Sequence, residues 1–207
     1  MKQSIHILIA DDHAVVRRGL RSILQLEKDF QIVGEASNGT ETVELARRLK
    51  PHVIIMDLIM PEKSGGEATA EILAELPDTR ILLLTTFGTA DDMAKALKAG
   101  AVGALMKTSD ESEIIASIRT VAAGGQAVSD EIKRLMAENP PVPELTPRQL
   151  EILNSMSRGY SNAEIAEVFG INEFTVREHV ANIMAKLDAS NRAEAVATAL
   201  RKSLLKF

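Results

Sequence analysis

The stretch VIIMDLIMP, residues 53–61, places a single carboxylate, that of Asp57, among large apolar side chains. A short apolar run of this kind is typical of a strand that is buried in a sheet. Burying a lone carboxylate is costly, and an unpaired one becomes protonated rather than remain charged. We therefore expect Asp57 to end a buried strand at a place where neighbouring groups compensate its charge.

Apolar runs of the same kind alternate with amphipathic helical segments as far as Gly125. The runs lie at Ile5–Ala10, Gln31–Ala36, Val53–Asp57, Arg80–Thr85 and Val102–Met106. Strands that alternate with helices form βαβ units and a parallel sheet. Capping-box spacings mark two of the helix starts, at Ser64 with Glu67 and at Thr108 with Glu111. The first part of the chain is therefore predicted to be a five-stranded, doubly wound α/β domain with five helices.

A proline-rich stretch, NPPVPE at residues 139–144, separates this part from a second one. A helical pattern at Val128–Ala137 precedes it, and the prolines make it a short, stiff connector. Beyond it the pattern is wholly helical, and a tight turn at Gly170 joins two of four helices into a helix-turn-helix. Capping signals open these helices at Thr146, Ser161, Asn172 and Asn191. The predicted parts are an α/β domain over 1–125, a helix and linker over 126–143, and an all-α domain over 144–207.

Composition excludes several classes of protein. The 207 residues include no cysteine, which excludes disulfides and thiolate chemistry and fits a reducing compartment. The apolar run at Ile5–Ala10 is too short for a signal peptide or a membrane span. We therefore expect a cytoplasmic protein without membrane contact.

Polar residues follow four of the predicted strands and converge on one rim of the sheet. In an open parallel sheet, ligands bind outside the carboxyl ends of the strands. The residues at these ends are Asp11, Asp12, Asp57, Thr85 and Lys107. Three neighbouring carboxylates repel one another, and Mg²⁺ relieves this repulsion by taking carboxylate ligands and completing its shell with water and phosphate oxygens. A carboxylate beside Mg²⁺ and a lysine can attack phosphorus to give an acyl phosphate.

Residues 5–125 resemble a response-regulator receiver domain, a flavodoxin-like fold. The resemblance rests on ILIADD at 7–12, IIMDLIMP at 54–61, LLLTT at 82–86 and GALMK at 103–107. It implies that Asp57 accepts a phosphoryl group from a sensor histidine kinase. It also implies that Asp11, Asp12, Asp57 and the backbone carbonyl of Ile59 hold Mg²⁺. Thr85 and Lys107 would then bind the phosphoryl oxygens.

Two positions depart from the pattern of the receiver family. The fifth strand often carries an aromatic residue that moves with the threonine, and this chain has Ala104 there. Phe87 is a candidate replacement. The acceptor loop Glu62–Ser64 also lacks an acidic residue that is common before Gly65. We expect the phosphorylation chemistry to survive both changes and the coupling to output to weaken.

Residues 144–207 resemble the LuxR-type helix-turn-helix of the NarL/FixJ family of response regulators. The match runs through LTPRQLEIL at 145–153, GYSNAEIAEVFGINEFTVREHVANIMAKL at 159–187 and SNRAEAV at 190–196. In the third helix, an apolar stripe from Val176 to Leu187 faces the core, and the side with Arg177 is expected to enter the major groove. Arg177 is the candidate for a guanine contact. The residues assigned to DNA binding are Ser161, Asn162, Thr175, Val176, Arg177, Glu178, His179, Asn182 and Lys186.

The charge of the second part bears on how it binds DNA. Residues 146–207 contain 8 Lys and Arg and 7 Asp and Glu, a balance of +1, whereas the whole chain carries −5. This balance is a weak electrostatic footprint, so we expect weak non-specific affinity for one module. Two modules on a pseudo-palindrome would compensate through effective concentration. The last helix is a candidate dimer seam, and we expect a homodimer in the active state.

These patterns together predict a transcriptional regulator that phosphorylation of Asp57 controls through dimerisation and promoter binding. It is not expected to be an enzyme beyond its own phosphoryl transfer and hydrolysis. One alternative is a constitutive DNA-binding protein whose receiver serves only for docking or dimerisation, which Ala104 and the acidic third helix favour. A second is an aspartate-nucleophile phosphatase. Such enzymes usually carry another aspartate two residues after the nucleophile, where this chain has Ile59.

Overall fold

A parallel sheet with helices on both faces forms the first of two units of the chain. The computed structural model describes residues 4–86, 90–138, 145–202 and 204–205. The chain divides into Met1–Pro140 and Pro141–Phe207. The predicted linker at 139–144 and Phe87 lie outside the described residues.

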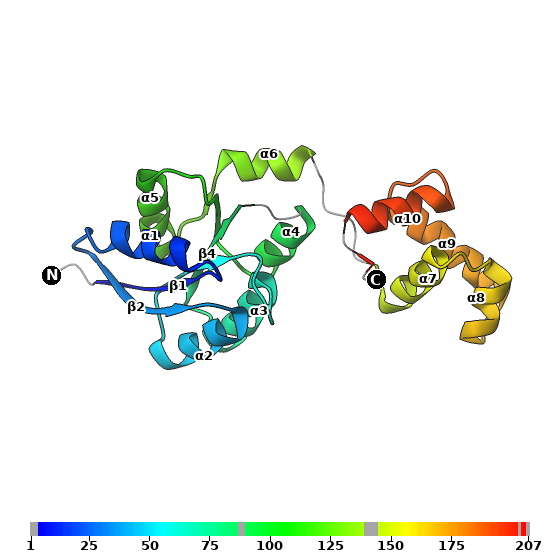
Figure 1. Cartoon of the computed structure of the whole chain (residues 1–207), viewed down its shortest axis with the longest axis horizontal. Coiled ribbons are helices and arrows are strands. Elements are labelled where there is room, and N and C mark those ends of the chain that lie inside the picture. The colour runs from blue at the N-terminus through cyan, green and yellow to red at the C-terminus, as the bar shows by residue number, and fades with distance from the viewer. Residues whose placement is uncertain (1–3, 87–89, 139–144, 203, 206–207) are drawn as a thin grey trace. The chain divides into compact units, whose positions relative to one another are not determined.

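The strands of the first unit are all parallel and follow the order β2-β1-β3-β4-β5-β6. Figure 1 shows the sheet with helices on either side of it. The strands span Ile5–Ala10 (β1), Phe30–Ala36 (β2), Val53–Asp57 (β3), Arg80–Thr85 (β4), Gly103–Met106 (β5) and Ala127–Val128 (β6). The helices span Ala14–Leu24 (α1), Gly39–Leu49 (α2), Gly65–Glu75 (α3), Ala90–Lys98 (α4), Glu111–Ala122 (α5) and Asp130–Glu138 (α6). The doubly wound α/β prediction is confirmed, and the strand order reverses at β1 and β3.

Two apolar clusters fill the two faces of the sheet. Helices α1 and α5 cover one face, where Leu24 and Ile118 pack on Ile55 of β3. Helices α2, α3, α4 and α6 contribute to the cluster on the other face, which includes Ile54 and Met56 of the same strand. Alternate residues of β3 therefore face opposite cores, which explains why the strand is an unbroken apolar run.

The segment predicted as helix and linker over 126–143 contains the expected helix, as α6, and also a short strand that was not predicted. Ala127 pairs with Gly103 and adds β6 as a short sixth strand at the edge of the sheet. Helix α6 follows, and its Ile132 is fully buried in the first unit's core. The first unit therefore continues past residue 125 to the end of α6, and the sheet has six strands rather than five.

Side-chain caps fix most of the helix starts as predicted. Ser64, Thr146 and Ser161 form capping boxes with Glu67, Gln149 and Glu164. Asn172 and Asn191 cap their helices by accepting backbone N–H bonds. The predicted box at Thr108 with Glu111 is wrong. Asp110 caps α5 instead, because its carboxylate accepts the backbone N–H of Glu113 one turn into the helix.

Four helices form the second unit around their own core. They span Pro147–Ser157 (α7), Asn162–Phe169 (α8), Glu173–Lys186 (α9) and Arg192–Arg201 (α10). Gly170 adopts a left-handed conformation with φ of 62°, which ends α8 and turns the chain into α9. Val176, Val180 and Ile183 of α9 are buried against α7 and α8 residues such as Leu153 and Ile165. The predicted helix-turn-helix is therefore α8, the turn at Gly170 and α9.

Replacing Ile132 with alanine tests whether α6 belongs to the first unit. We expect a loss of about 3 kcal/mol in that unit's stability, because the change removes a fully buried side chain from a packed core. Hydrogen exchange of β5 and α6 in the full chain measures this loss. Lys133→Ala on the exposed side of α6 is the control. Equal protection in both variants would show that α6 is only a linker.

Candidate functional site

Two buried carboxylates and one lysine meet at the carboxyl ends of the strands of the first unit. Strands β1 and β3 are hydrogen-bonded neighbours, so Asp11 and Asp57 leave the sheet side by side. They are 1% and 4% exposed. Lys107 follows β5, two strands away from β3, and its Nζ lies 2.7 Å from Asp57 Oδ2 and 2.7 Å from Asp11 Oδ2. The lysine therefore bridges the two carboxylates that the sequence placed on this rim.

Burial and pairing act on these charges in opposite directions. Burial is the largest effect on the pKa of Asp57 and raises it; the hydrogen bond and charge of Lys107 lower it, the nearby Asp11 raises it, and the pKa is raised overall. Burial lowers the pKa of Lys107, but its pairing with the Asp11 and Asp57 carboxylates outweighs burial and raises its pKa overall. One cation thus faces two buried carboxylates, and the site retains an excess of negative charge that favours a further cation.

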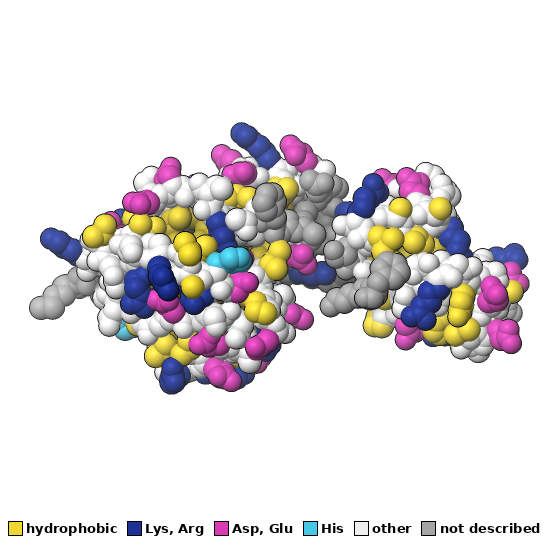
Figure 2. All heavy atoms as spheres, in the orientation of Figure 1, with side chains coloured by type: hydrophobic (Ala, Val, Ile, Leu, Met, Phe, Trp, Pro, Cys, Tyr) yellow, Lys and Arg dark blue, Asp and Glu magenta, His cyan; other side chains and the backbone are white. Residues whose placement is uncertain are grey.

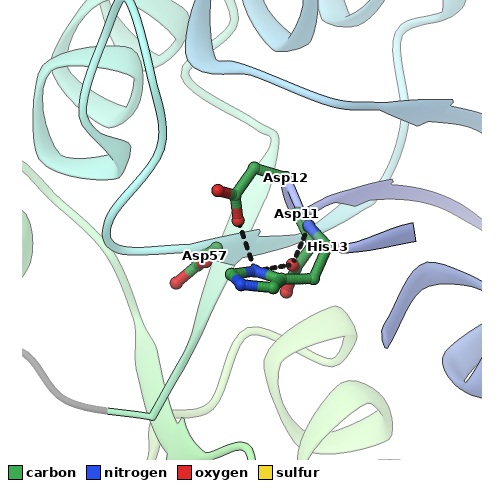
Figure 3. A group of neighbouring side chains, drawn as sticks. All are labelled: Asp11, Asp12, His13 and Asp57. Atoms are coloured by element: carbon green, nitrogen blue, oxygen red, sulfur yellow. Dashed lines mark hydrogen bonds and ion pairs between the residues drawn. The ribbon is translucent and has the colours of Figure 1, made fainter. Parts of the chain in front are cut away.

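The acidic side chains of this rim are close enough together to bind a hard cation such as Mg²⁺. Asp11, Asp12, His13 and Asp57 each offer a ligand atom, and these atoms lie within 4.8 Å of one another (Figure 3). Three of the four are carboxylates, which are the ligands that Mg²⁺ prefers. Sequence reasoning left His13 aside. Its Nδ1 lies 2.6 Å from Asp12 Oδ1, and both side chains are more exposed than those of Asp11 and Asp57.

Thr85 lies at the end of β4, next to β3 in the sheet. Leu84, the residue before it, pairs with Asp57. The Thr85 side chain is buried, and its Oγ1 finds no hydrogen-bond partner among the described residues. A buried hydroxyl without a partner is rare in native proteins. Thr85 therefore presents an unused donor at the same rim as Asp57.

The loop after β3 holds the Asp57 carboxylate from the other side. The backbone N–H of Ile59 donates to Asp57 Oδ1 at 3.3 Å. Gly65 N donates to the Leu58 carbonyl at 2.9 Å and brings the start of α3 against this loop. A Cβ at Gly65 would fall inside contact distance of the Asp57 carbonyl oxygen, so only glycine fits there. Ile59 keeps an exposed side chain, and its carbonyl as a metal ligand stays a prediction.

Some of the residues predicted to bind DNA are exposed, and others are buried or already bound to neighbouring side chains. Arg177, Glu178 and Asn182 are exposed on α9. Arg177 pairs with Glu173 at 2.7 Å one turn earlier. Val176 is completely buried in the second unit's core, so its assignment as a DNA-contacting residue is wrong for its side chain. The apolar stripe of the sequence had already indicated that this side chain faces the core.

The remaining predicted DNA contacts lie at the helix starts and on the flanks of α9. Ser161 caps α8 and is exposed, while Asn162 accepts a hydrogen bond from Arg192 at 3.1 Å. Thr175 and His179 are half-buried. Lys186 donates to the buried Gln149 at 2.9 Å, which holds it against α7. These positions stay predictions as phosphate contacts.

Comparison with known proteins gives the family. The profile of the response regulator receiver domain matches residues 7–119, and that of the bacterial regulatory proteins of the luxR family matches residues 143–199. The chain belongs to the NarL/FixJ family of two-component response regulators. It combines a receiver with a LuxR-type DNA-binding domain and acts as a transcription regulator.

Relatives of this response regulator match it over nearly its whole length. The transcriptional regulatory protein LiaR of Bacillus subtilis is 40% identical over 97% of this chain and 99% of its own. The response regulator VraR of Staphylococcus aureus is 36% identical over 98% and 99%. The solved structure of ChrA, from a heme-sensing two-component system, is 33% identical with a TM-score of 0.59, over 98% and 99%.

A more distant structure supports the fold alone. RcsB from Salmonella enterica serovar Typhimurium bound to promoter DNA has a TM-score of 0.70 at 23% identity, over 95% of this chain and 98% of that one. Within the described residues, none of the helices has the length and apolar character needed to cross a bilayer.

Replacing Asp57 with asparagine should stabilise the metal-free receiver. The fold raises the pKa of Asp57 above its usual value of 3.8, so the ionised carboxylate costs stability once the pH exceeds that value. Lys107 keeps Asp11 as a partner in the variant. With a chelator present, we expect a gain on the order of 1 kcal/mol at neutral pH that shrinks as the pH falls toward 3.8.

Hydrogen exchange of the β3 and β4 amides in the full chain measures this gain. Asp78→Asn, an exposed change of the same charge at the opposite end of β4, is the control. A variant less stable than wild type at neutral pH would contradict the assignment of a net cost to the buried carboxylate.

Proposed function

We propose that Asp57 is the phosphoacceptor of this response regulator and that a sensor histidine kinase is the donor. A carboxylate oxygen of Asp57 attacks the phosphorus of a phosphohistidine, the phosphorus–nitrogen bond breaks, and the histidine leaves with its electron pair. The product is an acyl phosphate. The observation that supports this most directly is the buried Asp57 carboxylate, paired with Lys107 beside the unpartnered hydroxyl of Thr85.

The side chains around Asp57 have distinct tasks in this proposal. Asp11, Asp12, Asp57 and the carbonyl of Ile59 would hold Mg²⁺, which offsets charge on the transferring phosphoryl group when bound. Lys107 exchanges its bond to Asp57 Oδ2 for one to a phosphoryl oxygen. Thr85 donates its hydroxyl to another phosphoryl oxygen and so gains a partner, which it lacks among the described residues. The receiver thus supplies the catalytic groups for its own phosphorylation, and the kinase supplies the phosphoryl group.

Phosphorylation then shifts a conformational equilibrium that controls dimerisation and promoter binding. The phosphoryl group adds roughly 1.5 to 2 negative charges to the rim. A firm switch, from 1:99 to 99:1, needs roughly 5.5 kcal/mol of difference between the states. Ala104 is buried in β5 in the place of an aromatic reporter residue, so we expect a weaker switch than this.

In the second unit, we propose that α9 enters the major groove of double-stranded DNA. Arg177 would reach a base edge, and Ser161, Asn162, Thr175, His179 and Lys186 would contact phosphates from the flanks. Acidic side chains reduce the attraction of this helix for phosphates, because Glu173 lies one turn before Arg177 and Glu178 directly follows it. Both signs of charge are also interspersed on the face of the unit that Figure 2 shows. The affinity of one module is therefore expected to be weak, and a homodimer on two half-sites would supply the rest.

The alternative, a constitutive DNA-binding regulator, is favoured by Ala104 and by the acidic side chains of α9. Ala104 stands where receivers often carry the aromatic residue that moves with the threonine. Under this alternative, the receiver is a docking or dimerisation module and DNA binding ignores the state of Asp57.

Phosphorylation with acetyl phosphate and Mg²⁺ tests the acceptor. Intact mass should show one added phosphoryl group on the wild-type chain and none on Asp57→Asn, because the variant lacks the nucleophilic oxygen. Omitting Mg²⁺ should slow the reaction strongly. A phosphoryl group that also appears on the variant would move the acceptor elsewhere.

The same samples measure how strongly the switch is coupled to DNA. Binding to a pool of random-sequence duplexes, with selection for tight sites, should improve on phosphorylation of the wild type and not of Asp57→Asn. Equal selection by both proteins, before and after phosphorylation, would favour the constitutive alternative.

Replacing Glu173 with glutamine should strengthen binding to duplex DNA of random sequence. The pair with Glu173 occupies the Arg177 guanidinium, and the change frees it while removing a like charge near the phosphates. We expect the slope of log affinity against log salt to steepen by about one unit. Glu151→Gln, which breaks the similar pair of Arg148 on α7, is the control. Equal slopes for both variants would show that α9 does not face DNA.

A further inference from the structure

The side chain of Phe174 is 67% exposed at the second position of α9. The apolar core of the second unit takes in Phe169 and Ile171 from the preceding helix and turn, and the described core does not include Phe174. The other two phenylalanines that the structure describes pack on the cores of their units, and an arginine lies over each ring, Arg119 over Phe30 and Arg148 over Phe169. Packing within the unit therefore does not account for an aromatic residue at position 174.

The helical repeat places Phe174 on the exposed face of α9. Residues 174, 177, 178 and 181 follow the spacing of one helix face, and all four are exposed. The buried stripe of Val176, Val180 and Ile183 lies on another side. Phe174 thus shares its face with Arg177 and lies one turn closer to the start of the helix. Residues in this first part of a recognition helix are those that contact base edges.

The chemistry of the side chain selects its target within the groove. Phenylalanine has no hydrogen-bond donor or acceptor, so it cannot read the polar edge of a base or hold a phosphate. The one apolar group that base pairs present in the major groove is the 5-methyl group of thymine. Contact with this methyl removes both apolar surfaces from water.

We infer that Phe174 is a specificity-determining residue that packs on the methyl group of a thymine in each half-site. The inference rests on the proposed entry of α9 into the major groove. Arg177, one turn later on the same face, would read a neighbouring base through hydrogen bonds. The preference for thymine would come from the removal of apolar surface from water. The ion pair between Arg177 and Glu173 would not change this preference.

A selection experiment identifies the preferred base. The full-length chain, phosphorylated with acetyl phosphate and Mg²⁺, is used to select tight binders from duplexes with a randomised core. We expect a thymine to be enriched at one position of each half-site for the wild type. Phe174→Ser should lose the enrichment at that position alone, and Phe174→Leu should keep it. Val168→Ser, at another exposed apolar residue on α8, is the matched control and should select the wild-type sequence.

Deoxyuridine then removes only the methyl group from the selected thymine. For the wild type, we expect affinity to fall about threefold to fivefold for each half-site substituted, the factor expected for one buried methyl group. Phe174→Ser should bind the thymine and deoxyuridine probes equally. Tyr160, the only tyrosine in a chain without tryptophan, reports through its fluorescence that each variant of this unit is folded.

The outcomes separate this inference from the proposed function. If neither the wild type nor any variant enriches a sequence, the proposed entry of α9 into the major groove fails, and the inference fails with it. If the wild type enriches a sequence that Phe174→Ser also enriches, with equal deoxyuridine effects, only the inference fails. A loss of self-association by Phe174→Ser with unchanged DNA preference would also overturn it and assign the exposed ring to a protein contact.

Discussion

The bridge from Lys107 to Asp11 and Asp57 is the interaction on which the receiver's chemistry depends. Two carboxylates with little access to water would each shift toward the neutral form if left unpaired. The lysine reaches them from β5, across the breadth of β4, and so links the ends of three strands. This arrangement offsets part of the cost of burying the Asp57 carboxylate, and it leaves a negative excess that a divalent cation can neutralise.

Thr85 and Lys107 show how the same rim can respond to a phosphoryl group. The lysine is already bound to the carboxylate, whereas the threonine hydroxyl has no partner among the described residues. A phosphoryl group on Asp57 would offer oxygen atoms to both at once. The gain in free energy from binding a phosphoryl oxygen is larger for Thr85 than for Lys107. A buried donor without a hydrogen-bond partner costs free energy until it is paired, and Lys107 is already paired. Ala104, on the strand that leads to Lys107, offers no large ring to carry this change outward.

The second unit balances apolar and charged groups on its exposed helix face. The near-neutral charge of residues 146–207 and the pair of Glu173 with Arg177 limit the attraction to phosphates. The exposed Phe174 on the same face would add an apolar contact, whose contribution to the binding free energy is not screened by salt. A module with weak electrostatic attraction gains more of its selectivity from such short-range contacts, since non-specific binding is mainly electrostatic.

The sequence by itself determined the alternating strands and helices, the converging rim residues and the helix-turn-helix, because each follows from local periodicity, caps and strand ends. The tertiary structure alone decided that β6 and α6 complete the first unit. The apolar side of α6 is buried only because Ile132 packs into the core on one face of the sheet, and the sequence does not show which surface covers it. It also decided that the Thr85 hydroxyl finds no partner among the described residues, whereas the apolar stripe of the sequence had already indicated the burial of Val176. Burial and hydrogen bonding across the chain depend on segments distant in sequence, which a local pattern does not contain.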